Sequence, residues 1–129
     1  MLSKRKFKNI KIIDWVKYEN LSSFLSIANV LIVTLEKDAS TFSVPSKIYA
    51  YLTIEKPILG SMPIENLGSK IINKVKAGYV SKPDDIESFI NNAKKIIKNK
   101  KIRTYFLNNS KKLRNTSINK MIKIINEEK

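Results

Sequence analysis

The segment Ser43-Val44-Pro45-Ser46-Lys47 places hydroxyls, a proline and a lysine directly before a run of helical periodicity. Proline is tolerated in the first turn of a helix, so Pro45 predicts a helix that begins here. The first turn of a helix exposes backbone N–H groups and carries partial positive charge, which favours an anion. Ser46 can add a hydroxyl donor and Lys47 a point charge, so the segment can form a cradle for a diphosphate. The alternative is that Ser43 is an ordinary N-cap and Lys47 a solvated lysine.

Three further groups of residues are candidates for chemistry. Residues 61–66 form a second strand-to-helix loop that can face the same ligand, with an ordinary turn and helix cap as the alternative. Trp15 and Tyr18 can stack on a base or a sugar, or pack in or around the core. Asp84 and Asp85 are predicted to start a helix rather than to form a catalytic carboxylate pair.

The composition excludes several classes of enzyme. The 129-residue chain has no Cys and no His, which removes disulfides, Cys-ligated zinc and the commonest general base. Hydrolases built on a Ser/His pair and zinc peptidases are therefore excluded. We predict no metal site and no cofactor.

The net charge of +14 is consistent with a nucleic-acid or anionic-membrane partner. The cations are 22 Lys and 3 Arg, whereas proteins that read bases lean on Arg for bidentate contacts, so nucleic acid is not predicted as the partner. No apolar run approaches the 18 residues typical of a membrane span, and the N-terminus lacks the features of a secretory signal. We expect a cytoplasmic protein whose lysine-rich C-terminal helices can rest peripherally on the anionic inner face of the plasma membrane.

The order of apolar patterns predicts an α/β fold. Short β-branched or apolar runs predict strands over residues 9–13, 30–35, 57–60 and 77–80. Helical spacing predicts helices over residues 21–28, from 45 to about 52, 64–75, from about 84 to 98, 100–113 and 117–127. Strands that alternate with helices predict a parallel Rossmann-like sheet with flanking helices and a helical C-terminus. Such sheets bind ligands beyond the carboxyl ends of their strands, and the segment that contains Ser46 follows the second predicted strand.

Several segments together resemble a known family over residues 10–113. "IKIIDWVKYENLSSFLSIANVLIVTL" is similar to the strand, turn, helix and strand of the GT-B-fold family 4 glycosyltransferases. "VPSKIYAYLTIEKPILGS" resembles the donor segment of the branch that acts in bacterial polysaccharide, O-antigen and capsule synthesis, and "AGYVSKPDDIESF" resembles the family's closing run. The order and spacing of these segments carry the resemblance, because each motif alone is weak.

The resemblance implies a nucleotide-sugar donor such as a UDP-sugar, and a retaining transfer to a polysaccharide or lipid-linked acceptor without a metal. It implies that the donor diphosphate and sugar are faced by Ser43, Val44, Ser46 and Lys47. It places the nucleotide or ribose near Ala50 and Tyr51, and it assigns no catalytic residue. The chain departs from the family at two glutamate positions, near Phe42 and Ala50, and at Glu55, where the family usually has Gly.

The resemblance also implies an incomplete C-terminal half of a GT-B fold. We expect residues 1–115 to form a partial nucleotide-sugar-binding Rossmann-like domain and residues 116–129 a C-terminal helix. The acceptor-binding half and the first strands of the donor half have no counterpart in the sequence, and the edge near residues 10–13 is expected to be unpaired. The chain is therefore expected to be inactive alone, or to work with a separately encoded half.

A hypothesis from another class stays open. The chain can be a non-catalytic basic α/β binding module that docks a partner protein or an anionic surface through its lysines. Anion binding would then spread over the C-terminal lysines and depend steeply on salt, whereas a donor site requires binding at residues 43–47.

Overall fold

The fold is known from a computed structural model, which describes residues 8–39, 45–114 and 123. In chain order, its elements are α1 (Tyr18–Ser26), β1 (Leu31–Thr34), α2 (Ser46–Thr53), β2 (Ile58–Ser61), α3 (Leu67–Val75), β3 (Gly78–Ser81), α4 (Ile86–Lys98) and α5 (Lys100–Arg114). The predicted helix over residues 117–127 lies outside the described residues except for Lys123.

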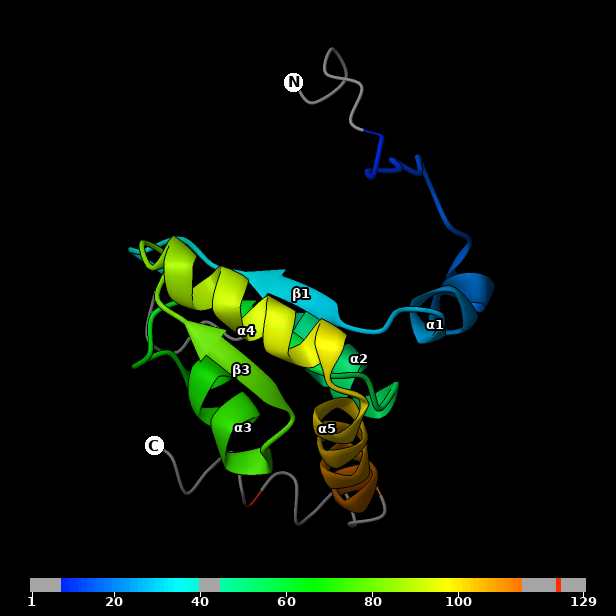
Figure 1. The fold of residues 1–129 in the computed structure, drawn as a ribbon. Coiled ribbons are helices and arrows are strands. Elements are labelled where there is room, and N and C mark those ends of the chain that lie inside the picture. The colour runs from blue at the N-terminus through cyan, green and yellow to red at the C-terminus, as the bar shows by residue number, and fades with distance from the viewer. Residues whose placement is uncertain (1–7, 40–44, 115–122, 124–129) are drawn as a thin grey trace.

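The strands form a parallel sheet in the order β1-β2-β3, which confirms the predicted α/β, Rossmann-like class (Figure 1). Leu31 at the start of β1 pairs with Ile58, and Ile58 pairs with Gly78. Gly78 is required here, because a Cβ at this position would lie 1.8 Å from the Ile58 carbonyl oxygen. Helices connect consecutive strands, as parallel pairing requires.

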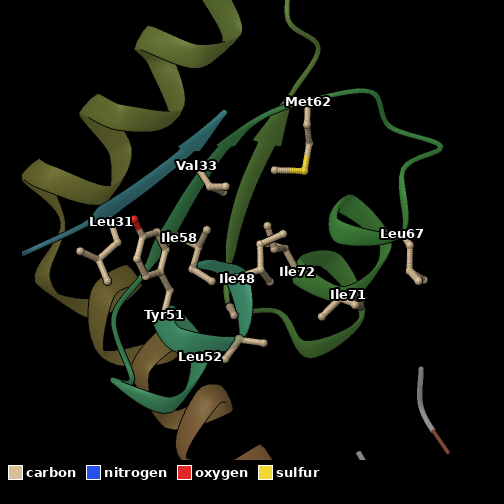
Figure 2. Close-up of a cluster of buried hydrophobic side chains, with 11 residues drawn as sticks. Leu31, Val33, Ile48, Tyr51, Leu52, Ile58, Met62, Leu67, Ile71 and Ile72 are labelled. Atoms are coloured by element: carbon tan, nitrogen blue, oxygen red, sulfur yellow. The ribbon is translucent and has the colours of Figure 1, made fainter. Parts of the chain in front are cut away.

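One face of the sheet packs against α2 and α3 around the larger core cluster (Figure 2). Leu31 and Val33 point inward from β1, whereas Ile32 between them is 51% exposed, as expected from the two-residue period of a strand. The remaining buried members of this cluster are Ile48, Tyr51, Leu52, Ile58, Met62, Leu67, Ile71, Ile72 and Ala77. This cluster anchors the buried side of α2 and leaves its other side to solvent.

The opposite face of the sheet packs against α4 and the first half of α5. Leu59 of β2, Ile96 of α4 and Phe106 of α5 form a smaller cluster there. The Phe106 ring meets the Tyr79 ring edge-to-face, with 5.0 Å between centroids, which is a favourable arrangement for two aromatic rings. Both faces of the sheet are therefore covered at β2 and β3, whereas the side of β1 that carries Ile32 stays open to solvent.

The predicted strand over residues 9–13 is wrong. These residues form no strand, and Ile10, Ile12 and Ile13 are 52%, 62% and 45% exposed. A strand exists only when its backbone groups pair with a neighbour, and among the described residues no other strand lies beside this run. Packing of Trp15 in a core is also wrong, because its side chain is 74% exposed.

The backbone at Glu55 adopts a conformation that glycine usually occupies. Glu55 follows α2 with a φ of 60°, in the left-handed region where glycine has no steric cost. The family usually has Gly at this position, so the left-handed conformation is kept here without the residue best suited to it. The Glu55 carboxylate lies 2.9 Å from the Arg114 guanidinium, at the end of α5.

Candidate functional site

The carboxyl ends of the three described strands form one edge of the sheet. Thr34, Ser61 and Ser81 are aligned in the pairing register at this edge. Ser81 is buried and its hydroxyl accepts a hydrogen bond from Asn92 of α4 at 3.1 Å. The loop after β1 leaves from this edge and leads to α2, so the predicted cradle lies where open α/β sheets bind ligands.

The first turn of α2 has a buried side and an exposed side. Pro45 occupies the N-cap position and offers no side-chain acceptor to the helix amides. Ile48 is fully buried in the core, and its amide donates to the Pro45 carbonyl at 2.9 Å. Ser46 and Lys47 are exposed beside it. The packing of Ile48 therefore fixes the helix start while leaving both polar side chains accessible.

The predicted site residues differ in where they lie. Ser46 and Lys47 are exposed together at the start of α2, whereas Ser43 and Val44 lie outside the described residues. Ala50 is exposed one turn after Ser46, on the same side of the helix.

Tyr51 lies on the buried side of α2 instead. Its side chain is 9% exposed, and its hydroxyl donates to the Ile32 carbonyl of β1 at 3.4 Å. Burial raises the pKa of this phenol, so it stays protonated and remains a donor. The exposed surface near the predicted ribose position is therefore formed by Ala50 rather than by the Tyr51 ring.

An ion pair connects two loops at the carboxyl edge. Lys37, in the loop after β1, lies 2.8 Å from the Asp84 carboxylate in the loop after β3, and both side chains are largely exposed. The hydrogen bond with Asp84 and its charge raise the pKa of Lys37. The sequence did not predict this pair, because nothing local connects residues that are far apart along the chain. Only Asp85 acts as the predicted helix start: it accepts from the Ser88 amide at 2.9 Å.

The loop over residues 61–66 provides a capped helix start. Asn66 is fully buried, and its side-chain oxygen accepts from the Gly68 amide at 2.7 Å. The Ser69 hydroxyl donates to the Pro63 carbonyl at 2.7 Å, which closes the same turn. This geometry matches the turn-and-cap alternative for the loop. It contrasts with α2, where Pro45 supplies no such cap.

The positive charge available at this edge comes from helix amides and lysines. In the described part of the chain, no three Asp, Glu, His or Cys side chains gather where they could hold a metal ion. The first turn of α2 combines the positive end of its helix dipole with the Lys47 ammonium. This arrangement can bind an oxyanion and stabilise negative charge on it.

Comparisons with known proteins assign the chain to a family. No curated protein and no solved structure gives a significant match. None of the described helices is both long and apolar enough to cross a bilayer. The sequence model of the family described as "Glycosyl transferases group 1" matches residues 2–113, most of the 129-residue chain. The chain therefore belongs to the group 1 glycosyltransferases.

Proposed function

We propose that this chain binds the diphosphate of a nucleotide-sugar donor, such as a UDP-sugar, at the start of α2. Residues 43–47 form the cradle, with Ser46 and Lys47 as the described side-chain contacts. Ala50 lies on the same side of the helix and borders the ribose. The reaction served is a retaining transfer of the sugar to a polysaccharide or lipid-linked acceptor.

One observation carries this proposal: α2 begins at the carboxyl edge of the parallel sheet with an exposed serine and lysine and no side-chain cap from Pro45. Within the described residues no side chain caps these amides, so they are open to water or to a ligand, and phosphate oxygens are suitable acceptors. The capped starts of α3 and α4 at the same edge are less suitable, because Asn66 and Asp85 already accept from their amides.

The same groups suit the chemistry of the leaving group. When the bond between the sugar and the diphosphate breaks, negative charge grows on the diphosphate. Fixed amides and the Lys47 ammonium can stabilise that charge without reorganising, which is how enzymes gain most from electrostatics. Membership of the glycosyltransferase family supports this assignment of the anion site.

The acceptor side of the reaction requires further polypeptide. The described residues form one layered α/β unit around one sheet. A GT-B enzyme closes its active site between two such units. We therefore propose that residues 1–115 supply a partial donor domain, followed by a helix over residues 116–129, and that an acceptor-binding half, in the same or another polypeptide, completes the site. The bacterial polysaccharide branch and a cytoplasmic location, peripheral to the membrane, belong to the same proposal.

The first experiment is a UDP titration followed by amide NMR shifts on the wild type, Lys47→Ala and the control Lys94→Ala. Lys94 is an exposed lysine in the middle of α4, so its replacement removes the same charge elsewhere. We expect shifts centred on residues 41–50 and about tenfold weaker binding in Lys47→Ala only, because a charge-assisted contact is lost. Equal weakening in both variants would indicate diffuse attraction to the lysines and favour the basic binding module.

A second variant distinguishes a phosphate-binding site at the start of α2 from an ordinary helix start that binds no phosphate. Ser46→Asp places a negative charge in the first turn of α2, where it should stabilise the helix by roughly 0.5 kcal/mol. The same charge should repel a diphosphate. We expect a slightly higher melting temperature and no detectable UDP binding. If UDP still binds with unchanged affinity, the diphosphate does not lie at the start of α2.

A further inference from the structure

A hollow at the opposite edge of the sheet is lined by several cations. It lies at the amino ends of β1 and β2, where α4 ends and α5 begins. Its volume is about 240 Å³. The lining residues are Ala28, Asn29, Lys56, Pro57, Lys100, Arg103, Thr104 and Leu107. Three of these eight side chains are cationic and none is acidic.

The cations around this hollow form no ion pair with a carboxylate of the described residues. Lys56 and Arg103 are half-buried, so water screens their mutual repulsion less completely than on an open surface. An anion in the hollow would convert this repulsion into attraction.

The helix dipole adds to the positive field. Lys100 and Lys101 occupy the first turn of α5, which contains no acidic residue. Cations at this end oppose the dipole and destabilise the helix, whereas α1 and α4 carry Glu19 and Glu87 in their first turns. The start of α5 therefore has an electrostatic cost that a bound anion would offset. Because the Asn99 side chain already accepts from the Lys101 and Ile102 amides, the anion would be held by side chains rather than by these amides.

The position of Arg103 is set by the end of α4. One of its guanidinium nitrogens donates to the Ile96 carbonyl at 2.8 Å and also to the Ile97 carbonyl. These bonds hold the guanidinium plane in place beside the hollow, and its other N–H groups remain to bind a ligand. Lys100 lies three residues earlier in α5, so both side chains extend from the same face of that helix.

We propose that this hollow binds a phosphate group, held by Lys56, Lys100 and Arg103. Arg and Lys together are typical ligands of phosphate, and Asn29 and Thr104 supply further polar contacts. The volume suits one anionic group, because pockets for larger ligands usually exceed about 300 Å³. The site lies at the amino ends of the strands, whereas the proposed donor site lies at their carboxyl ends, so the two are separate.

The test uses inorganic phosphate at constant ionic strength, with amide NMR shifts as the readout, on the whole chain. We expect shifts at residues 100–104 and 56–57, and phosphate binding at least about tenfold weaker in Lys100→Glu. Lys100→Glu should still fold, because a carboxylate at the start of α5 favours the helix dipole. Lys56→Gln provides a second variant that leaves α5 untouched, and Lys94→Glu is the control for net charge.

A parallel arm distinguishes the source of the phosphate. Vesicles of phosphatidylglycerol and of phosphatidylcholine are compared in a flotation assay with the same variants. Binding of free phosphate that Lys100→Glu and Lys56→Gln abolish supports a site for a soluble phosphate. Binding of phosphatidylglycerol vesicles alone, lost in both variants, supports a lipid headgroup as the source. No binding in either arm, or equal loss in Lys94→Glu, overturns the proposal. The Lys47→Ala variant should bind phosphate here normally, which keeps this result independent of the donor site.

Discussion

Two helices of similar length, α1 and α2, differ in how they use their apolar residues. Both show apolar residues at helical spacing, but α1 has no buried residue, whereas α2 buries Ile48, Tyr51 and Leu52. We call residues 8–30 the N-terminal segment, and residues 31–39 with 45–114 the sheet body. None of the residues of the N-terminal segment is buried. Apolar spacing thus identifies a helix, but only a neighbouring surface decides whether that helix contributes to a core.

The end of α1 is where the N-terminal segment reaches the core of the sheet body. Leu25 of α1 and Ala28 after it are partly buried against the larger cluster. A hollow of about 390 Å³ separates much of α1 from α2, with Tyr18 and Leu21 on one side and Ala50 on the other. Stability should therefore be concentrated in the sheet body.

The largest effect is expected for matched leucine truncations in the two regions. Leu52 is 2% exposed in α2, and Leu21 is 38% exposed in α1. Leu52→Ala should lower the free energy of unfolding by about 3 kcal/mol, because it leaves a cavity in a packed core. Leu21→Ala should cost less than about 1 kcal/mol, since less apolar area is lost. Urea unfolding measures both values, and equal losses would show that α1 packs as firmly as α2.

A smaller effect is expected at the helix starts. The Asn66 side chain caps α3 and is buried, whereas Lys17 at the N-cap of α1 makes no side-chain bond to its helix. Asn66→Ala should cost about 1–2 kcal/mol, because the Gly68 amide loses its buried acceptor. Lys17→Ala should change the unfolding free energy by less than about 0.5 kcal/mol. A loss from Lys17→Ala as large as that from Asn66→Ala would contradict the distinction between the two regions.

The sheet body was largely predictable from its sequence, for physical reasons that are local. Three strands and their connecting helices follow from apolar runs punctuated by Pro45, Pro57 and Gly78. The helix start at Pro45 follows from proline chemistry alone. The same reasoning failed over residues 9–13, because a β-branched run predicts a strand but cannot say whether an edge is available for it to pair with.

The candidate site was predictable only in part. Ser46, Lys47 and Ala50 are exposed, and their binding roles stay a prediction, while the burial of Tyr51 depends on its packing against β1. The Lys37–Asp84 pair could not be predicted, because it joins loops that only the folded sheet brings together. The predicted contact of Ser43 and Val44 with the donor stays a prediction.

Residues with positive φ provide a third comparison, between two left-handed positions within the sheet body. Among the described residues that are not glycine, only Glu55 and Lys76 have positive φ, and both belong to the sheet body. Lys76→Gly should stabilise the protein by about 1 kcal/mol, because glycine adopts this conformation without strain. Glu55→Gly should gain less, since it also removes the carboxylate that pairs with Arg114. Thermal unfolding compares the two, and a gain from Glu55→Gly as large as that from Lys76→Gly would indicate that the Arg114 pair contributes nothing.

The smallest effect is a pH dependence at the start of α4. The Ser88 amide donates to the Asp85 carboxylate and holds the pKa of Asp85 below its usual range, so the unfolded chain binds this proton more tightly than the folded one. The stabilisation is therefore fully present above about pH 5 and decreases as the pH falls below the ordinary aspartate pKa of about 3.9. Asp85→Asn keeps a side-chain acceptor but does not titrate. Melting temperatures of the wild type and Asp85→Asn are measured from pH 6 to pH 2. Their difference should be constant near pH 6, and the melting temperature of the wild type should fall relative to that of Asp85→Asn toward pH 2. Parallel curves over the whole range would mean that the charge on Asp85 adds nothing to the cap. The greater stability expected of α4 relative to α1 would then come from packing alone.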